Sequence, residues 1–295
     1  MHPTPESLPS TRLTALAPAK INLGLHVLRR RADGYHDLDT VFVAVGWHDT
    51  LTVAPSPSLA FSSSDPALPT DASNLVVKAA LALAKHVGIK PYAALHLGKQ
   101  IPYGAGLGGG SSDAATTLRA LTRLWSVDVS DEALHAMAAR LGSDVPFFLD
   151  PRPMHATGRG EALAPLVVPG GSAYTLPYPL VVAVPDVHVS TADAYRLVRP
   201  NDMNRADVAA TVASSDLGRW RRDLVNDFEA PVVAAFPALA AVRTALTDAG
   251  AAYVSMSGSG SAFFGVFEDE PRAAAAAERL AASGNRVWHG FATSA

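Results

Sequence analysis

A glycine-rich stretch from Ile101 to Ser112 constrains the fold of this chain more than any other part of its sequence. It reads IPYGAGLGGGSS, contains five glycines and leads into a segment with helical periodicity. Glycine permits left-handed backbone and the close approach of another group. A helix start adds unpaired N–H groups and the positive end of the helix dipole. The combination predicts a loop that binds a chain of phosphates; the alternative is a flexible loop that happens to precede a helix.

The composition limits the classes of protein to which the chain can belong. Its 295 residues suffice for two ordinary domains or one large domain, and 48% hydrophobic residues can build a core. The net charge is −3 and no Lys/Arg block occurs, which disfavours nucleic-acid and anionic-membrane partners. Cysteine is absent, which excludes a disulfide framework, a thiol nucleophile and a Cys-ligated metal, and fits a cytoplasmic protein.

The N-terminal residues 1–11 are rich in proline and serine and lack the apolar segment of a signal peptide. We expect them to form a disordered extension. No run of 18 apolar residues occurs, so we expect no membrane-spanning segment.

The first half of the chain alternates strand and helix patterns. Alternation from Ile21 would place Asn22, Gly24 and His26 on one face of a strand. Asp71 or Ser73 is expected to cap the first helix. The predicted strands cover 13–27 with an interruption at Pro18, 41–45, 49–53 and 93–97; the predicted helices cover 74–86, 111–125 and 130–141; and 55–69 is predicted to be a surface loop.

The second half begins after a Pro/Gly-rich linker at 168–179. Asn226-Asp227-Phe228-Glu229 is predicted to open a long apolar helix that ends at Thr247. The order of strands and helices predicts an α+β layer of the split β-α-β type. The predicted strands cover 180–184, 252–256, 262–267 and 286–291, and the other predicted helices cover 190–198 and 271–282.

Lys20 and Asp144 are candidate catalytic residues. Lysine is scarce in this chain, and Lys20 stands among small and apolar neighbours, so it is either retained for its chemistry or a strand-end lysine whose amine reaches solvent. Asp144 lies between a helix-ending glycine and an apolar Val-Pro-Phe-Phe run, where a carboxylate loses solvent unless it has a partner. The alternative is that Asp144 only caps the next helix.

The segment 29–38 is predicted to be a turn built on Asp33-Gly34 between two strands. It presents Tyr35, His36 and several arginines together. It is either a pocket for a flat polar ring with a phosphate nearby or a solvated hairpin tip.

The type of phosphate site follows from what the glycine loop lacks. Gly104-x-Gly106-x-x-Gly109 matches the dinucleotide fingerprint, but the loop comes late in the chain and no acidic residue ends a strand about 20 residues further on. It is not a P-loop, because no Gly-Lys-Ser/Thr follows the glycines. A phosphate loop without its own lysine, combined with Lys20 and Asp144 elsewhere, favours phosphoryl transfer. In such a reaction the protein positions the reacting groups and neutralises the charge of the phosphates.

Five motifs in order resemble the GHMP kinase superfamily. Within it, the chain is most similar to the family of kinases that act on 4-diphosphocytidyl-2-C-methyl-D-erythritol, and the resemblance covers nearly all of residues 12–290. The motifs are Pro18-Ala-Lys-Ile-Asn-Leu23, Gly34-Tyr-His36, the loop 102–112, Leu141-Gly-Ser-Asp-Val-Pro-Phe-Phe148 and Ser255-Met-Ser-Gly-Ser-Gly260.

The resemblance implies a two-domain α+β fold. Its N-terminal domain, expected at 12–170, would bind ATP and be similar to the second domain of ribosomal protein S5. Its C-terminal domain, expected at 179–292, would be ferredoxin-like and bind substrate. The resemblance further implies a cytoplasmic enzyme, monomer or homodimer, that uses ATP with Mg²⁺ to phosphorylate the substrate's 2-hydroxyl in the non-mevalonate route to isoprenoids.

The resemblance also assigns roles by position. Asp144 matches the general base and Lys20 the catalytic lysine, with Asn22 beside them; no protein residue is assigned to a metal. Tyr103 stands where methionine is expected, and Tyr195 lies beyond the 168–179 insertion. The residues implied for ATP are Pro102, Tyr103, Gly104, Ala105, Gly106, Leu107, Gly108, Gly109, Gly110, Ser111, Ser112, Asn74 and Lys99, and those implied for the cytidine substrate are Tyr35, His36, Arg159 and Tyr195.

Three other functions stay open on the sequence alone. A sister kinase for mevalonate, homoserine or a sugar would share the glycine loop but not Gly34-Tyr35-His36. A non-catalytic nucleotide-binding module would bind ATP without turnover. A Rossmann-type oxidoreductase would bind a nicotinamide cofactor.

Overall fold

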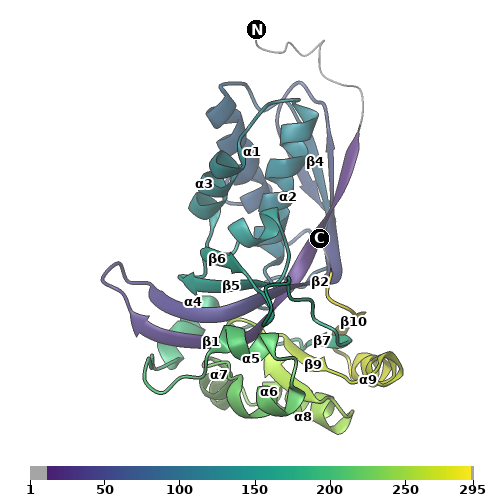
Figure 1. Ribbon diagram of the computed structural model, residues 1–295. Coiled ribbons are helices and arrows are strands. Elements are labelled where there is room, and N and C mark those ends of the chain that lie inside the picture. Colours follow the sequence, from purple (N-terminus) through teal and green to yellow (C-terminus); the bar gives the residue numbers. More distant parts are fainter. Residues whose placement is uncertain (1–11, 294–295) are drawn as a thin grey trace. The chain divides into compact units, whose positions relative to one another are not determined.

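The computed structural model describes residues 12–293, so the extension expected at 1–11 lies outside the described residues. The chain divides into two compact units (Figure 1). The first comprises the chain up to residue 19, residues 47–101 and residues 108–150; the second comprises residues 20–46, 102–107 and those from 151 onward. Each unit is described by itself below.

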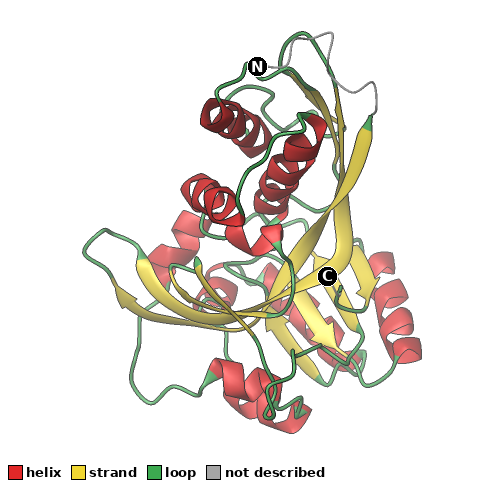
Figure 2. Cartoon of the chain, turned by 45° about the horizontal axis from the view of Figure 1, so that its top comes forward, coloured by secondary structure: helices red, strands yellow, loops and turns green. Residues whose placement is uncertain are grey.

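Two long paired strands contribute to both units, β1 (Leu13–Arg30) and β2 (His36–Ala54). Both are drawn as long continuous strands in Figure 2. The predicted interruption at Pro18 and the predicted separation of 41–45 from 49–53 are therefore wrong. Among the described strands β1 pairs only with β2, and a strand with an open edge tolerates a proline that cannot donate to the ladder.

The first unit is a small sheet with three helices. The 50–54 end of β2 pairs antiparallel with β4 (Ala94–Gly98), and β3 (Ala60–Ser63) pairs parallel with β4. The predicted surface loop at 55–69 thus hides a four-residue strand, whose Ser-containing sequence gave no strand pattern. Figure 1 shows the helices gathered beside β4. They are α1 (Leu75–Val87), α2 (Gly109–Leu124) and α3 (Asp131–Leu141), followed by the short 3₁₀ helix η2 (Pro146–Leu149).

Two helix starts in the first unit test the capping predictions. The predicted cap Ser130 is confirmed, because its side chain accepts a hydrogen bond from the Ala133 N–H. The cap predicted for α1 at Asp71 or Ser73 is wrong. Asn74 caps α1 by accepting from the Val76 N–H at 2.9 Å, whereas the Asp71 carboxylate accepts from Ser73 instead.

The second unit holds the 38–42 part of β2, which pairs antiparallel with β5 (Met154–Gly158); β5 pairs in turn with β6 (Ala162–Pro165). A second, fully antiparallel sheet has the order β10-β7-β9-β8. Its strands are β7 (Leu180–Val184), β8 (Tyr253–Met256), β9 (Phe263–Val266) and β10 (Arg286–Gly290). The helices are α4 (Thr191–Leu197), α5 (Val208–Ala213), α6 (Leu217–Asp223), α7 (Glu229–Ala235), α8 (Ala238–Asp248) and α9 (Glu270–Ala282).

The long helix predicted to run from Asn226 to Thr247 is two helices, α7 and α8, that meet at Phe236-Pro237. Proline has no N–H to continue the ladder and disfavours helical backbone in the residue before it. Pro237 therefore ends α7 and starts α8. The apolar periodicity continues across the break, which is why it suggested one helix.

Gly24 interrupts the regular backbone of β1 with a left-handed conformation, at φ of +69°. Asn22 and His26, on either side of it, are both buried, and the Asn22 amide bonds to Thr40 of β2. That Asn22, Gly24 and His26 share one face of the strand stays a prediction.

Candidate active site

The glycine loop has the left-handed backbone that its glycines permit. Gly104, Gly106 and Gly108 all have positive φ, between +69° and +78°. A Cβ at Gly106 would lie 2.1 Å from the Ser257 carbonyl oxygen, so only glycine fits there. Helix α2 begins at Gly109, two residues earlier than predicted, and no side chain in the described part of the chain caps it. Its first N–H groups are therefore available to an anion.

The other loop residues divide by exposure. Pro102, Ala105 and Leu107 are buried and anchor the loop, whereas Tyr103 is 71% exposed. Gly110 and Ser111 are half-buried in the first turn of α2. The Ser112 hydroxyl is fully buried there and has no hydrogen-bond partner among the described residues.

Lys20 is held in the second unit by two oxygen acceptors. Its ammonium donates to the Asn22 side chain at 2.7 Å and to the Gly106 carbonyl at 3.0 Å, and it lies 5.2 Å from the centre of the Phe42 ring. Lys20 is only 4% exposed. The alternative of a lysine whose amine reaches solvent is therefore wrong. Because the backbone N–H of Lys20 also bonds to the Leu107 carbonyl, the lysine and the glycine loop are joined twice.

Asn22 is oriented by a chain of hydrogen bonds. Its amide nitrogen donates to the Thr40 hydroxyl at 3.0 Å, and that hydroxyl donates to the Gly24 carbonyl at 2.5 Å. The amide oxygen is thereby directed to Lys20. Asn22 and Thr40 are both at most 1% exposed.

Asp144 lies in the first unit, in the turn between α3 and η2, and is half-buried. The N-cap of η2 is Val145, and none of the described side chains caps that helix. Asp144 is therefore not the cap of η2, which removes the alternative reading of this carboxylate. The turn lies against the first turn of α2, because a Cβ at Gly142 would lie 4.0 Å from the Ser111 hydroxyl oxygen.

Lys99 is buried between two carboxylates that the sequence predictions missed. Its ammonium bonds to Asp49 and, at 3.0 Å, to Asp113. Asp49 also accepts from the backbone N–H groups of Gln100 and Ile101. Burial, partly offset by the Lys99 charge, raises the pKa of Asp113 to about 7. The available signal was a carboxylate at position 49 within a strand of alternating apolar residues.

Asn74 and Lys99 use part of their hydrogen-bonding capacity within the protein. The Asn74 amide oxygen caps α1 and its nitrogen donates to the Pro69 carbonyl. Each side chain keeps one donor hydrogen beyond these bonds, since an amide has two hydrogens and an ammonium three.

The four predicted substrate residues meet in two contacting pairs within the second unit. The rings of His36 and Tyr195 stack with centres 4.8 Å apart, and the Arg159 guanidinium lies 4.8 Å from the centre of the Tyr35 ring. Burial, together with the nearby Arg30 charge, lowers the pKa of His36 and favours its neutral form. Tyr195 is 159 positions from His36, a contact that only the fold could reveal.

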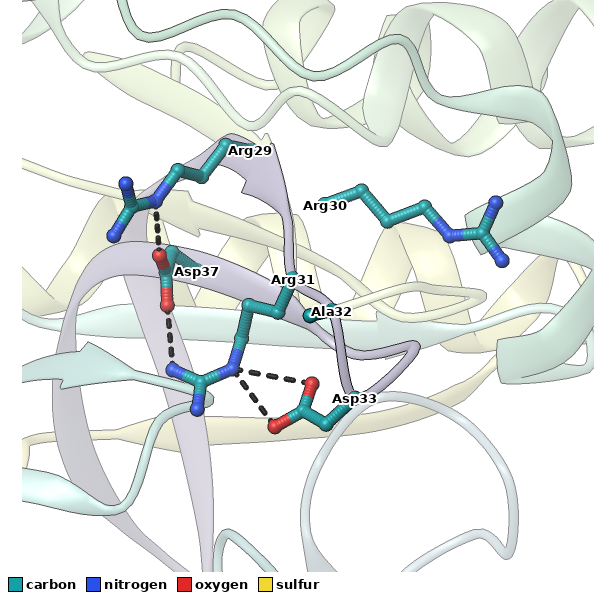
Figure 3. A pocket seen from close by; sticks show the side chains of 6 residues that line it. All are labelled: Arg29, Arg30, Arg31, Ala32, Asp33 and Asp37. Carbon is teal, nitrogen blue, oxygen red and sulfur yellow. Dashed lines mark hydrogen bonds and ion pairs between the residues drawn. The ribbon is translucent and has the colours of Figure 1, made fainter.

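An open pocket of 460 Å³ lies beside this cluster on the hairpin tip (Figure 3). Arg29 and Arg31 both bond to Asp37, and Arg31 also bonds to Asp33. Arg30 extends away from these ion pairs in Figure 3. The hairpin therefore presents a positive side chain near His36, as the sequence predicted for this turn.

The described residues contain no group of three or more His, Asp or Glu side chains that could hold a metal ion by themselves. Within the same residues, no helix has both the length and the apolarity needed to cross a membrane.

Comparison with known proteins gives the class to which this fold and site belong. The model of the GHMP kinases N terminal domain matches residues 74–150, and that of the GHMP kinases C terminal region matches residues 208–286. The chain belongs to the GHMP kinase family. The predicted superfamily and its α+β fold are confirmed.

A relative from Salinibacter ruber, named 4-diphosphocytidyl-2-C-methyl-D-erythritol kinase, is 53% identical over 265 residues, covering 90% of this chain and 93% of the relative. A crystal structure of a 4-(cytidine 5'-diphospho)-2C-methyl-D-erythritol kinase has a TM-score of 0.81 at 41% identity and covers 96% of this chain and 100% of that chain. A homoserine kinase from Cytophaga hutchinsonii has a TM-score of 0.73 at 19% identity, over 96% of this chain and 94% of its own, and shares the fold alone.

Proposed function

We propose that this chain uses ATP to phosphorylate the 2-hydroxyl of 4-diphosphocytidyl-2-C-methyl-D-erythritol in the non-mevalonate route to isoprenoid precursors. The observation that carries the proposal is the 53% identity, over nine tenths of the chain, to a relative named for that kinase activity. The sister kinases share the fold, so the fold alone would not select this substrate.

The donor side of the proposed reaction uses the glycine loop and the start of α2. Loop N–H groups and the uncapped N-terminus of α2 favour the negative charge of the ATP phosphates. Ser112 offers a buried hydroxyl that has no hydrogen-bond partner among residues 12–293, which fits a polar ligand. Magnesium binds through few protein oxygens and the nucleotide phosphates, and it neutralises phosphate charge when bound. Ser111 and Ser112 are the residues that would hold it.

The acceptor side uses the aromatic residues near the hairpin tip. Tyr35, His36 and Tyr195 offer flat faces for the cytosine ring. Neutral His36 has one nitrogen that donates and one that accepts, and both can read the edge of the base. Arg159, placed on the Tyr35 ring, adds positive charge beside the diphosphate of the substrate.

The chemical step uses Asp144 and Lys20. In the proposed mechanism Asp144 accepts the proton of the 2-hydroxyl while the oxygen attacks the γ-phosphorus and ADP leaves. Lys20 neutralises the charge that develops in this step. Asn22, fixed by Thr40, orients the ammonium. Asn74 and Lys99 remain proposed nucleotide-binding residues, each through its remaining donor hydrogen.

The remaining assignments are part of the same proposal. The two matched family regions fall one within each of the expected domains, 12–170 and 179–292. The proposed enzyme is a cytoplasmic monomer or homodimer.

A coupled assay of ADP release tests the function. The purified chain is given ATP and Mg²⁺ with the cytidine-linked methylerythritol, and separately with mevalonate, homoserine and a sugar. We expect turnover with the cytidine-linked substrate at a kcat/KM at least a hundredfold above the others, since unfilled base-binding groups penalise the smaller acceptors. Equal or greater turnover of a sister substrate would overturn the proposal.

A further inference from the structure

The segment Asn226-Asp227-Phe228-Glu229, whose sequence predicted only a helix start, lies where β1 meets the loop after β8. The backbone N–H of Leu25 donates to the Val225 carbonyl, and the N–H of Asp227 donates to the Leu25 carbonyl. The segment is thus bonded to β1 five residues from Lys20. All residues considered below belong to the second unit.

The Asn226 side-chain amide donates two hydrogen bonds and accepts one within the second unit. Its nitrogen donates to the carbonyls of Met256 at 2.7 Å and Gly258 at 2.9 Å, and its oxygen accepts from the Phe228 N–H at 3.0 Å. Asn226 is 3% exposed. The amide therefore clamps the two carbonyls that flank Ser257.

Ser257 carries this clamp to the glycine loop. Its buried hydroxyl donates to the Gly106 carbonyl at 2.9 Å, the same oxygen that accepts from the Lys20 ammonium at 3.0 Å. A Cβ at Gly258 would lie 3.1 Å from that oxygen and 3.4 Å from the Lys20 nitrogen. The loop 256–258 therefore packs directly on the acceptor that fixes the ammonium.

We infer that Asn226 is a positioning residue for Lys20. Its side chain fixes, through the carbonyls on either side of Ser257, the Gly106 carbonyl that holds the ammonium. The backbone of its neighbours Val225 and Asp227 holds the strand that carries the lysine. The inference rests on the proposed catalytic role of Lys20. A catalytic group displaced by about 1 Å can cost a hundredfold in rate, so an interaction remote from the substrates can act on kcat.

The experiment compares Asn226→Ala, Ser257→Ala and the double variant in the ADP-release assay, with the KM of each substrate and the melting temperature measured in parallel. Ser255→Ala is the matched control. It removes a similarly buried hydroxyl two residues earlier, within β8, but one that donates to Glu229 rather than to Gly106. We expect kcat to fall about tenfold in Ser257→Ala and about a hundredfold in Asn226→Ala. Both KM values should stay within about twofold, and the double variant should be no slower than Asn226→Ala alone.

A double-mutant cycle of Ser257→Ala with Lys20→Ala tests the positioning role even where Asn226→Ala fails to fold. Ser257→Ala should slow the wild-type enzyme but not the Lys20→Ala variant, because its effect passes through the lysine. Equal kcat in Ser257→Ala and Ser255→Ala, or a further loss when Ser257→Ala is added to Lys20→Ala, would overturn the positioning role alone. Wild-type kcat in Lys20→Ala would instead overturn the catalytic lysine, and this inference with it.

Discussion

At the scale of single residues, the structure removes the purely structural explanations offered for Lys20 and Asp144, while their catalytic roles stay predictions. Lys20 is buried and bonded to Asn22 and Gly106, and Asp144 is not the cap of η2. A kinase needs a cation that neutralises the developing charge and a carboxylate that removes the proton of the acceptor hydroxyl. The buried Lys20 ammonium suits the first role, and the Asp144 carboxylate, which does not cap η2, suits the second. Substitutions that change charge or hydrogen bonding but little volume therefore test them best.

Asp144→Asn keeps the size of the side chain and removes its basicity. We expect kcat to fall about 10²- to 10⁴-fold, since the hydroxyl loses its proton acceptor. ATP binding, measured by calorimetry, should stay within about twofold of wild type, because the nucleotide contacts are untouched. Near-normal kcat would contradict the assignment of the general base.

His36→Ala removes one face of the stacked His36–Tyr195 pair. We expect the KM of the cytidine substrate to rise about tenfold or more, since stacking and a hydrogen bond to the base are lost together. The KM of ATP should not change. His86→Ala, an exposed position in the last turn of α1, is the matched control. An unchanged substrate KM in His36→Ala would reject the cytidine pocket.

At the scale of elements, two features support the start of α2. One is the run of left-handed glycines before it, and the other is the buried ion-pair network of Lys99 with Asp49 and Asp113. The first was visible in the sequence and the second was not. Asp49 and Asp113 meet at Lys99 only because β2, β4 and α2 come together in the folded unit. A substitution in each feature tests its contribution.

Gly106→Ala should disorder the glycine loop. The added Cβ would overlap the Ser257 carbonyl, and the left-handed backbone strains any other residue. We expect loss of ATP binding and turnover by about a hundredfold or more. Gly98→Ala, where a Cβ meets only ordinary contacts, should leave both within about twofold. Normal ATP affinity in Gly106→Ala would show that the loop does not hold the nucleotide.

Asp113→Asn should change how stability depends on pH. The folded-state pKa of Asp113, about 7, lies above that of an unfolded aspartate, near 4, so the folded chain holds the extra proton between these values. Wild type should therefore lose stability relative to Asp113→Asn as pH rises from about 4 to 7, by at most about 1.4 kcal/mol per pH unit, with a constant difference above pH 7. Denaturant titrations of both proteins at each pH measure the difference in their free energies of unfolding.

Asp216→Asn is the control for Asp113→Asn, and its stability difference from wild type should depend on pH in the opposite direction. Hydrogen bonds from the N–H groups of Arg219 and Gly218 lower the pKa of Asp216, which caps α6. Wild type should therefore lose stability relative to Asp216→Asn as pH falls through the range in which that carboxyl takes up its proton. A stability difference for Asp113→Asn that is flat or rises with pH would contradict the raised pKa.

The elements also show what the sequence could and could not predict. Local chemistry predicted the Asp33-Gly34 turn, the Ser130 cap and the loop leading into α2, because each depends on a few neighbouring residues. Wrong predictions arose where pairing overrode local signals, as at Pro18 in β1, or where a periodic pattern hid a proline, as at Pro237. Contacts across the chain, such as His36 with Tyr195, leave no local signal.

At the scale of the whole molecule, the proposed reaction draws on both units: Ser112 and Asp144 belong to the first, and Lys20 and His36 to the second. The glycine loop contributes residues to each. A ligand that binds only the folded chain raises its stability by an amount set by its concentration relative to Kd. Thermal unfolding can therefore report on donor and acceptor binding without any turnover.

A non-hydrolysable ATP analogue and the cytidine-linked substrate should each raise the melting temperature. At a hundred times its Kd, either ligand adds about 2.7 kcal/mol, which for a chain of this size corresponds to about 4 °C. His36→Ala should about halve the shift with the substrate at the same concentration, because a Kd raised about tenfold leaves about 1.4 kcal/mol of the stabilisation. It should keep the shift with the analogue, because only the acceptor contacts are removed. A nicotinamide dinucleotide should produce no shift, since no acidic residue follows the glycine loop at the position that binds its ribose. A shift with the dinucleotide and none with the ATP analogue would return the glycine loop to the dinucleotide-binding class.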